Sequence, residues 1–218
     1  MIRPDAPFLY DRARLADLPG EGIVLAGADE AGRGCLAGPL VAAAVALDYS
    51  RLPTRVLAGL TDSKLLRPAV REELYGRLLV VAARVAVVAV SSESIDRRGL
   101  HVCNLSALAS SLELLGACYD LALVDGFDLK RPDLRAQALV RGDRRSAAIA
   151  AASVVAKVTR DRLMHRVHSW HPEYGFDRHV GYGTSEHRQA IRSLGVCPLH
   201  RLSFAGVGSE QLVLLEEG

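Results

Sequence analysis

The sequence is poor in aromatic residues, and it lacks the cysteine patterns of a disulfide-bonded or metal-binding chain. Only 5% of the residues are Phe, Trp or Tyr, so we expect a core built mainly from small and branched side chains. The four cysteines form no CxxC pair and have no metal-ligand spacing, which favours a reduced, cytoplasmic protein with buried thiols. A charged-then-apolar leader is missing, and the longest apolar candidate, Leu78–Val90, is interrupted by Arg84. These absences predict a protein without membrane association.

Apolar material is what the chain has in quantity. Half of its 218 residues are hydrophobic, enough for one sizeable core. We see no internal repeat, low-complexity linker or domain boundary, and expect one domain over residues 1–218 with its core at about 22–204. Between Lys130 and Phe204 there are 14 Lys and Arg against 6 Asp and Glu. A basic half beside acidic motifs is typical of a polyanion-binding enzyme, although an ordinary solvated surface can have the same composition.

Apolar periodicity divides the chain into strands and helices. Segments of strand length occur at 23–29, 40–47, 84–91, 121–126 and 138–143. Helical spacing marks 68–82, 99–116, 146–170 and 185–194, whereas 174–187 is a glycine-rich loop. The first three strands can pair antiparallel, with a tight glycine turn between the first two, and the last two alternate with helices. This order predicts an α/β fold: a mixed five-stranded sheet, three antiparallel then two parallel strands, flanked by helices, with a helical C-terminal part.

Four acidic residues lie at the ends of predicted strands, next to glycine: Asp29, Glu30, Asp125 and Asp143. Because the carboxyl ends of parallel strands open into one crevice, we expect these carboxylates to converge. Alternation points Asp29 and Glu30 to opposite faces of the sheet, but at a strand end both can still reach one site. Gathered carboxylates repel one another unless cations are present, and they suit Mg²⁺ bound together with phosphate oxygens. The pattern indicates metal-dependent phosphodiester hydrolysis; the alternative for each acid alone is a turn or capping residue.

Several short motifs occur in the order found in a known family. They are Gly27-Ala-Asp-Glu-Ala-Gly-Arg-Gly, Asp62-Ser-Lys, Val124-Asp-Gly, Gly142-Asp, Ala151-Ala-Ser-Val-Val-Ala-Lys-Val-Thr-Arg-Asp, and Tyr174-Gly-Phe followed by His179-Val-Gly-Tyr-Gly-Thr. Each motif is weak alone, but the ordered set, from about Gly22 to Phe204, resembles bacterial ribonuclease HII, the type 2 ribonuclease H.

The resemblance implies a fold, a reaction and a set of partners. The fold is ribonuclease H-like, and Asp29, Glu30, Asp125 and Asp143 correspond to the catalytic acids, which hold Mg²⁺ or Mn²⁺ in a two-metal site. Such an enzyme cuts the RNA strand of RNA–DNA hybrids. It also cuts duplex DNA 5′ to a single embedded ribonucleotide, leaving 3′-hydroxyl and 5′-phosphate ends, which starts ribonucleotide excision repair. We expect a monomer that binds these duplexes.

The same resemblance assigns residues that recognise the substrate. Gly32-Arg33-Gly34 corresponds to the segment that recognises the ribose 2′-hydroxyl, and glycine lets the backbone approach the sugar closely. Tyr182 corresponds to the tyrosine that stacks on the next deoxyribose; its alternative is a half-buried loop aromatic. Arg33 favours this type over ribonuclease HIII, which usually has threonine there and an extra N-terminal domain. A general nuclease of the same superfamily and a non-catalytic nucleic-acid-binding protein are the competing hypotheses.

Weaker candidates for contacts with duplex phosphates are scattered along the chain: Ser63, Lys64, Asn104, Ser153, Lys157 and His187. Ser63 has the alternative role of a cap, and Lys157 that of an ion-pair partner for Asp161, one helical turn further on. The C-terminal sequence Gln211-Leu-Val-Leu-Leu, residues 211–215, is predicted to form a last helical turn.

Overall fold

The protein contains a mixed five-stranded sheet. This computed structural model describes residues 5–18 and 23–208, so the predicted helical turn at 211–215 lies outside the described residues. The strands are β1 (Val24–Ala31), β2 (Leu40–Asp48), β3 (Arg84–Val90), β4 (Leu121–Asp125) and β5 (Ala136–Leu139), in the order β3-β2-β1-β4-β5. β2 is antiparallel to β1 and β3, whereas β4 is parallel to β1 and β5. The predicted fold and strand pairing are confirmed.

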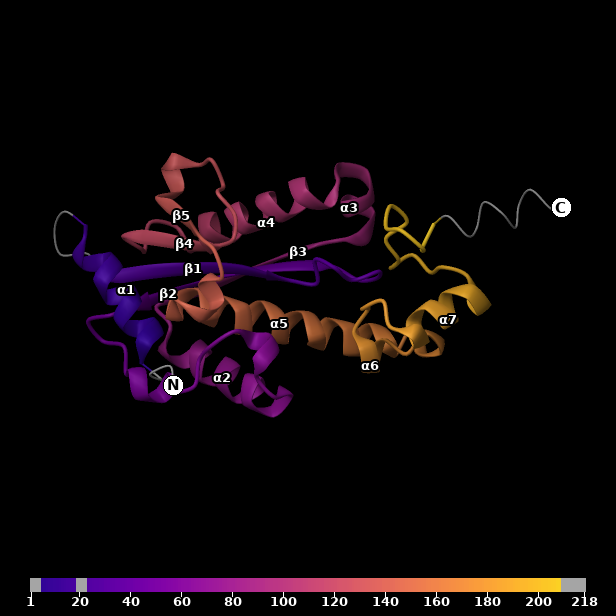
Figure 1. Cartoon of the computed structure of the whole chain (residues 1–218), viewed down its shortest axis with the longest axis horizontal. Coiled ribbons are helices and arrows are strands. Elements are labelled where there is room, and N and C mark those ends of the chain that lie inside the picture. Colours follow the sequence, from indigo (N-terminus) through magenta and orange to yellow (C-terminus); the bar gives the residue numbers. More distant parts are fainter. Residues whose placement is uncertain (1–4, 19–22, 209–218) are drawn as a thin grey trace.

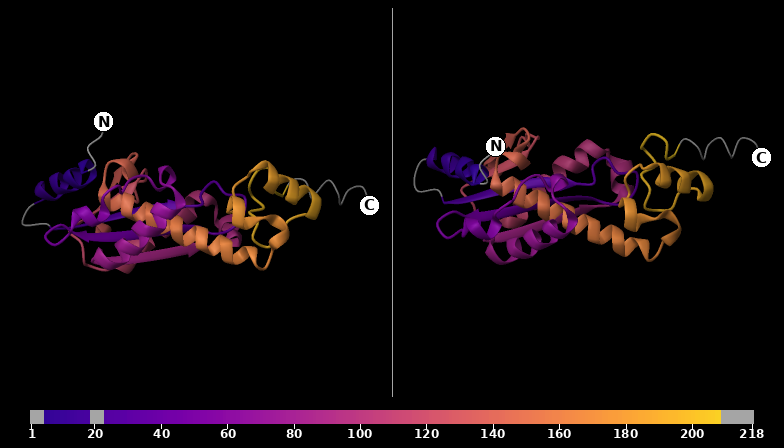
Figure 2. Two further views of the ribbon diagram at one scale, coloured as in Figure 1. Left: turned by 90° about the horizontal axis from the view of Figure 1, so that it is seen from below. Right: turned by 60° about the horizontal axis from the view of Figure 1, so that its bottom comes forward.

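Helices cover both faces of the sheet (Figure 1). On one face lie α1 (Ala6–Ala16), α2 (Pro68–Val81) and α5 (Ala147–His168), and on the other α3 (Ser92–Arg98) and α4 (Leu100–Leu115). α5 runs along the sheet and continues past it to α6 (Phe176–His179) and α7 (Ser185–Leu194), as Figure 2 shows. Together with the chain up to residue 208, α6 and α7 form what we call the C-terminal part. None of the helices in the described ranges is both long and apolar enough to cross a membrane.

Strand alternation separates the core into two layers. On β1, Leu25 packs with the α5 side, whereas its neighbour Ala26 packs with the α4 side. The α4 side of β1 and β2 is lined by small residues, namely Ala26, Ala28, Ala42, Ala44 and Ala46. These alanines let α4 lie close to the sheet, with Leu108 and Leu112 packed against them. The same alternation decides on which side each acid at the end of β1 lies.

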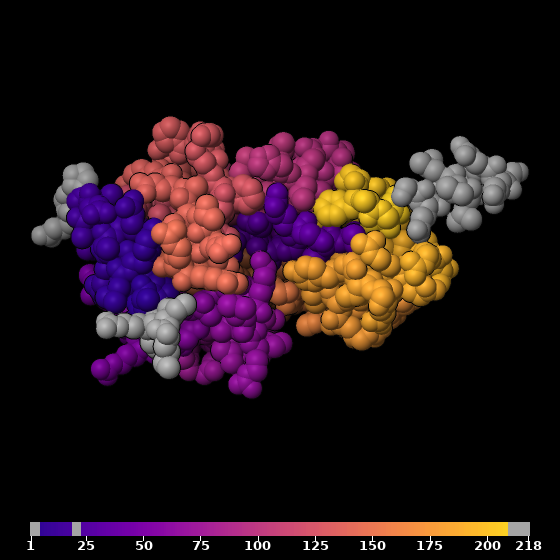
Figure 3. Space-filling model, in the orientation of Figure 1, coloured from indigo at the N-terminus to yellow at the C-terminus, as the bar shows by residue number. Residues whose placement is uncertain are grey.

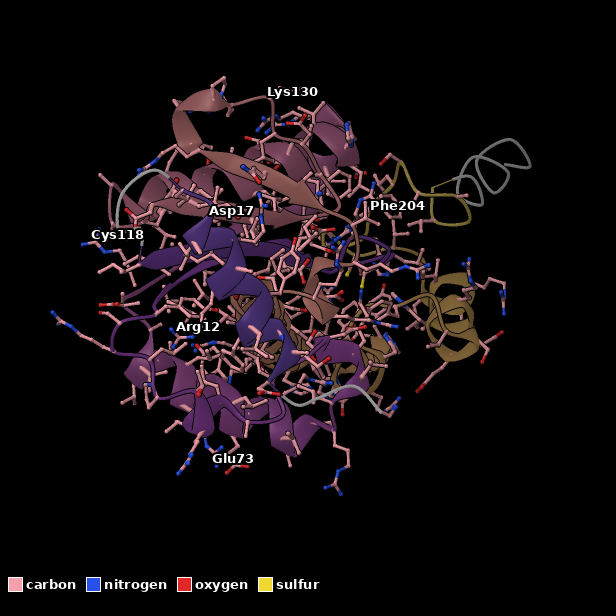
Figure 4. All side chains as sticks on the ribbon, turned by 60° about the vertical axis from the view of Figure 1, so that its left-hand side comes forward. Arg12, Asp17, Glu73, Cys118, Lys130 and Phe204 are labelled. Carbon is pink, nitrogen blue, oxygen red and sulfur yellow. The ribbon has the colours of Figure 1, made fainter. Side chains whose placement is uncertain are left out.

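Gly27 allows α5 to lie directly against β1. A Cβ atom at this position would be 2.0 Å from the carbonyl carbon of Ala148, in the first turn of α5. Ala148 is also held from α1, because its N–H donates to Oδ2 of the buried Asp11 at 2.9 Å. The hydroxyl of Tyr49 donates to the same oxygen, and burial raises the pKa of Asp11 to about 6. Figure 4 shows the molecule with the α1 side turned forward, so that α1 lies in front of the sheet.

Two predicted strand ends were wrong. β1 continues through both acids to Ala31, because Asp29 and Glu30 still pair with β2. β5 ends at Leu139, before the predicted end at 143, since Arg141 has a left-handed backbone with φ of 54°. The acids at these positions are therefore fixed by sheet pairing in one case and by a turn in the other.

Two predicted connections also differ from the structure. Residues 32–39 join β1 to β2 as an open loop instead of a tight turn. The predicted loop at 174–187 contains the one-turn helix α6, and the short helix α3, capped by the Ser91 hydroxyl, was not predicted. Both helices are shorter than the windows in which apolar periodicity is visible.

Gly27→Ala is expected to destabilise the protein strongly, by about 3 kcal/mol or more, because the new methyl group would overlap the backbone of α5. The matched control is Gly76→Ala, at an exposed position inside α2 where a Cβ meets nothing within 4 Å. This control should stabilise by about 0.5–1 kcal/mol through the helix propensity of alanine. Urea unfolding midpoints measure both changes. A Gly27→Ala protein with the wild-type midpoint would contradict the close packing of α5 on β1.

Candidate active site

Four acidic side chains meet where β1 and β4 end. Asp29 and Glu30 are the sixth and seventh residues of β1, Asp125 is the last residue of β4, and Asp143 lies in the turn between β5 and α5. Asp125 repels Asp29, Glu30 and Asp143 closely enough to raise the pKa of each. In Figure 3, dark purple atoms from the end of β1 and the following loop are visible between the 125–145 segment and the C-terminal part. The structure therefore brings all four predicted acids together.

Asp29 lies on the α5 side of the sheet and is almost completely buried. Its Oδ1 accepts the N–H of Glu30 at 2.7 Å, and its side chain lies beside Ser153 of α5. Ser153 is in turn hydrogen-bonded to Ser63, with 2.9 Å between the two hydroxyls. Burial raises the pKa of Asp29 well above its ordinary value, and repulsion from Glu30 and Asp125 raises it further. In the absence of a cation, this carboxyl group resists ionisation.

Glu30 lies on the opposite, α4 side, next to Asn104. Burial and the charge of Asp125 raise its pKa, while Arg33, Asn104 and Lys64 act against that rise. Its Oε2 is buried without a hydrogen-bond partner among the described residues, and so are both polar atoms of the Asn104 side chain. Unpartnered buried oxygen is costly in a folded protein, so its presence at this point is consistent with a position that a ligand completes.

Asp125 ties β4 to the turn that carries Asp143. Its Oδ1 accepts the N–H of Gly142 at 2.7 Å. A Cβ at Gly142 would lie 2.3 Å from Cδ1 of Ile149 in α5, so a larger residue here would have to displace the end of that side chain. Burial raises the pKa of Asp125, and it raises that of Asp143 together with repulsion from Asp62 and Asp125. The turn therefore places Asp143 beside the strand end although β5 stops four residues earlier.

Asp62 adds a fifth negative charge nearby, and its own interactions are structural. Its Oδ1 accepts the N–H of Lys64, and its Oδ2 accepts from Arg144 at 3.0 Å. It thus caps the short turn Ser63–Leu65, which includes Ser63 and Lys64 of the Asp62-Ser-Lys motif, and connects that turn to the one carrying Asp143. The exposed Lys64 lies near the cluster, because its charge opposes the rise in pKa of Glu30, Asp125 and Asp143.

The acid cluster fits divalent metal ions held with water and substrate. Among the residues that the structure describes, no three His, Cys, Asp or Glu side chains form a ready-made metal cage. Mg²⁺ does not need one, because it keeps several waters and takes only a few carboxylates plus phosphate oxygens. The raised pKa values of the four acids and the unpartnered Glu30 Oε2 both reflect negative charge that a cation would relieve.

The loop of residues 32–39 is held by two buried arginines that sequence reasoning missed. Arg160 of α5 donates to the carbonyls of Ala37, Pro39 and Val180 at 2.8–3.1 Å. Arg201 donates to the carbonyls of Gly38 and Arg33 at 2.9–3.2 Å, and burial lowers its pKa to about 10. A Cβ at Gly32, whose φ is +88°, would overlap the Arg160 side chain. The sequence contains one signal of this burial, and it concerns Arg160. This arginine is four residues from both Ala156 and Met164, which are buried on the same face of α5.

Gly32, Arg33 and Gly34 thus stand at the start of a rigid loop next to the acids. Arg33 is exposed, and its guanidinium lies over the ring of Phe127, 5.0 Å from the ring centre. Gly34 is exposed, and a Cβ there would meet nothing within 4 Å. The open side of Gly34 leaves room for a ligand to come close to the backbone.

Tyr182 lies beside the same loop although it is far away in the sequence. The carbonyl of its neighbour Gly181 accepts the N–H of Leu36 at 2.9 Å. The half-buried Tyr182 ring lies 5.3 Å from the Lys157 ammonium and 5.9 Å from the Arg160 guanidinium. Its hydroxyl is next to the buried Cys35, and burial raises the pKa of both groups.

The weaker candidates for phosphate contacts take different positions. Lys64 is exposed, but Ser63, Ser153 and Asn104 are buried beside the acids. Lys157 forms the alternative ion pair with Asp161, at 2.7 Å. The prediction for His187 does not agree with the structure, because its ring is fully buried with both nitrogens in hydrogen bonds, and no phosphate can reach it.

Comparison with known proteins gives a consistent picture. A family model described as Ribonuclease HII matches residues 26–207. The chain is 48% identical over 211 residues to the ribonuclease HII of Rhizobium johnstonii, covering 92% of this chain and 90% of the relative. Its fold is similar to the crystal structure of ribonuclease H2 from Pyrococcus horikoshii, with a TM-score of 0.76 and 26% identity over 89% of this chain and all of the other. It is also similar to RNase HII in its PCNA complex from Archaeoglobus fulgidus, with a TM-score of 0.71 and 30% identity over 84% and 95% of the two chains.

Asp29→Asn is expected to stabilise the metal-free protein at neutral and alkaline pH. Burial and repulsion raise the pKa of Asp29 in the folded protein, so as the pH rises the carboxyl group ionises in the unfolded chain first. The free energy of unfolding therefore decreases with pH until the pKa of the folded state is reached. Each pKa unit by which the folded value exceeds the unfolded value lowers the free energy of unfolding by about 1.4 kcal/mol, and asparagine, which does not ionise, removes this loss. In chelator, the unfolding midpoints of wild type and variant should coincide near about pH 4 and separate in favour of the variant toward about pH 8.

The control for this experiment is Asp48→Asn. A hydrogen bond from the Ser50 side chain lowers the pKa of Asp48, so its replacement should give the opposite trend with pH. A wild type as stable as Asp29→Asn at alkaline pH in chelator would refute the crowding of charge at the site.

Proposed function

Because the chain belongs to the ribonuclease HII family, and is therefore a ribonuclease H, we propose that it acts at junctions between RNA and DNA. In this proposal it hydrolyses the RNA strand of RNA–DNA hybrids and cuts duplex DNA 5′ to a single embedded ribonucleotide. The observation that carries it is the convergence of Asp29, Glu30, Asp125 and Asp143 beside a rigid loop that exposes Gly34. The role of such an enzyme would be to start ribonucleotide excision repair.

The four acids would hold the metal ions that the reaction needs. Two Mg²⁺ or Mn²⁺ ions bound there would supply an activated water and charge stabilisation for the leaving 3′-oxygen. Hydrolysis then breaks the bond between phosphorus and the 3′-oxygen, leaving a 3′-hydroxyl and a 5′-phosphate. The chain's own contribution is rigid placement. Sheet pairing with β2 and β5 fixes the three acids of β1 and β4, and the bond from the Gly142 N–H to Asp125 fixes the turn of the fourth.

Recognition of the ribonucleotide would come from the loop at 32–39 and from Tyr182. A 2′-hydroxyl can donate and accept hydrogen bonds, and an exposed glycine backbone allows it to approach closely. The planar Arg33 guanidinium, exposed above Phe127, is suited to a phosphate on the same strand. Tyr182 would stack on the following sugar, where a second 2′-hydroxyl would collide with the ring. Ser63, Lys64, Asn104, Ser153 and Lys157 would surround the acids and backbone phosphates of the bound duplex.

The first test uses a labelled DNA duplex with one internal ribonucleotide. With Mg²⁺ or Mn²⁺ we expect a single cut 5′ to the ribonucleotide, which chelator abolishes. Asp125→Asn should lower the rate at least about 100-fold, because it removes charge at the reacting phosphate. Asp128→Asn is the matched control, since Asp128 lies three residues further on, is exposed, and pairs only with Lys130 among the described residues.

The outcome also separates the competing hypotheses. Equal cleavage of an all-DNA duplex would favour a general nuclease of the same superfamily. Unchanged function in Asp125→Asn would favour a non-catalytic binding protein. Degradation of long hybrids without a cut at the single ribonucleotide would favour an activity like that of ribonuclease HIII.

Tyr182→Ala is expected to change selectivity more than general activity. Stacking on an aromatic ring is worth about 1–3 kcal/mol, so cleavage at the single ribonucleotide should fall about 5- to 100-fold relative to cleavage of a long RNA–DNA hybrid. The measurement is the ratio of kcat/KM for the two substrates. An equal fall for both substrates would show that Tyr182 supports the fold without reading the sugar.

A further inference from the structure

Three buried histidines lie directly behind Tyr182. His179 ends α6, His187 lies in α7, and His200 lies in the segment after α7. The rings of His179 and His187 stack with centres 4.3 Å apart, and Phe176 packs edge-on against His187 at 5.5 Å. All three are buried in the C-terminal part, away from solvent. A buried group of this kind has to have each ring nitrogen satisfied.

The partners of His187 and His200 determine which nitrogen carries the proton in each ring. Nδ1 of His187 is 2.9 Å from the carbonyl oxygen of Tyr182, which can only accept, so Nδ1 carries the proton. Nδ1 of His200 accepts the backbone N–H of Cys197 at 2.9 Å, whereas its contact with the Cys197 carbonyl oxygen is longer, at 3.3 Å. That oxygen already accepts the backbone N–H of His200 at 3.0 Å, so in the neutral ring the proton is on Nε2. The two Nε2 atoms are 3.1 Å apart, and such a contact needs one donor and one acceptor. The two assignments meet this need, because Nε2 of His200 carries a proton and donates it, and Nε2 of His187 carries none and accepts.

The result is a hydrogen-bond chain with one direction. It runs from the Cys197 N–H to His200, from His200 to His187, and from His187 to the Tyr182 carbonyl. The neighbouring His179 acts in a similar way, because its Nδ1 accepts the Gly181 N–H at 3.2 Å while its Nε2 donates to the Tyr174 carbonyl at 2.7 Å. Backbone on both sides of the Tyr182 side chain is thereby fixed from inside the C-terminal part.

We propose that His187 and His200 are positioning residues for substrate selectivity, which hold Tyr182 at the sugar beyond the cleavage site through this directed chain. The proposal rests on the proposed role of Tyr182 in reading that sugar. Neither histidine touches nucleic acid, because both rings are buried. The effect passes through the Tyr182 carbonyl, which also accepts the N–H of Thr184 at 2.8 Å, at the start of α7.

The chain works only with both rings neutral. A proton on His187 Nε2 would meet the donating Nε2 of His200. A proton on His200 Nδ1 would lose the 2.9 Å bond from the Cys197 N–H and keep only the 3.3 Å contact with the Cys197 carbonyl. Burial lowers the pKa of His187 to about 4, and it lowers that of His200. The titratable and charged groups that face the pair also disfavour a further positive charge: His179, Arg188 of α7, and His171 before α6. Cys197 completes the surroundings, with Sγ 3.2 Å from His200 Nδ1.

The first experiment reads the proton positions without nucleic acid. Long-range ¹H–¹⁵N spectra of the full chain should show His187 with its proton on Nδ1 and His200 with its proton on Nε2, both unchanged from about pH 8 down to about pH 6. Either ring in the other tautomer, or charged at neutral pH, would overturn the chain whatever the enzyme cleaves.

The second experiment measures selectivity as the kcat/KM ratio between the single-ribonucleotide duplex and a long hybrid. His187→Leu removes the donor to Tyr182 and should lower this ratio about 5- to 10-fold, as expected for one lost hydrogen bond. His187→Asn can still present an N–H near the position of Nδ1, and it should stay within about threefold of the wild type. His165→Asn is the control with an exposed histidine of α5, and it should leave the ratio unchanged.

A double variant separates positioning from general stability. If His187 acts through Tyr182, His187→Leu should change the ratio no further in a Tyr182→Ala background. Additive effects, or equal losses on both substrates in His187→Leu, would overturn the positioning role. A Tyr182→Ala enzyme with the wild-type ratio would instead refute the proposed function of Tyr182, and the positioning role with it.

Discussion

The structure depends on keeping negative charge crowded at the ends of β1 and β4. Four carboxyl groups lie where burial and mutual repulsion oppose ionisation, and Asp62 adds to that repulsion. Such an arrangement persists only when the surrounding backbone cannot relax. Sheet pairing on both sides of β1 and the close packing of α5 on Gly27 supply that rigidity. The N-terminus of α5 follows this region closely in the chain, because Asp143 lies just before the helix cap Ser146. Its first-turn N–H groups are already bound, that of Ala148 by Asp11 and that of Ile149 by the Ser146 hydroxyl.

Positive charge is buried in the same molecule, but it is kept apart from the acids. Arg160 and Arg201 are fully buried and bind backbone carbonyls of the 32–39 loop, and neither forms an ion pair with a carboxylate among the described residues. A guanidinium taken out of water has to recover its hydrogen bonds, and carbonyls in a fixed geometry provide them. The acids therefore remain free for a cation and substrate, while the loop beside them gains a rigid shape.

The sequence was sufficient for the parts of the site that follow from local pattern. Apolar alternation in β1 correctly placed Asp29 and Glu30 on opposite faces, and the strand order brought Asp125 to the same end. The sequence was insufficient where a polar residue is buried by contacts far along the chain. This applies to three polar residues that become buried only when the C-terminal part folds onto residues 32–39, namely Arg160, Arg201 and His200. For the same reason His187 was predicted to meet phosphate, although its two nitrogens are used inside the protein.

In the proposed function, the connection between the sheet and the C-terminal part separates the residues of the chemical step from those of substrate selectivity. The acids are fixed by the sheet, but Tyr182 depends on backbone contacts: the Gly181 carbonyl binds the Leu36 N–H, and Arg160 bridges Ala37 and Val180. These contacts set the distance between the loop that can meet a 2′-hydroxyl and the ring that can meet the next sugar. Because α5 carries both Arg160 and Ser153 beside Asp29, one helix relates that distance to the position of the acids. Under the proposed role of Tyr182, a shift in the C-terminal part would alter which sugar is accepted while the carboxylates stay in place on the sheet.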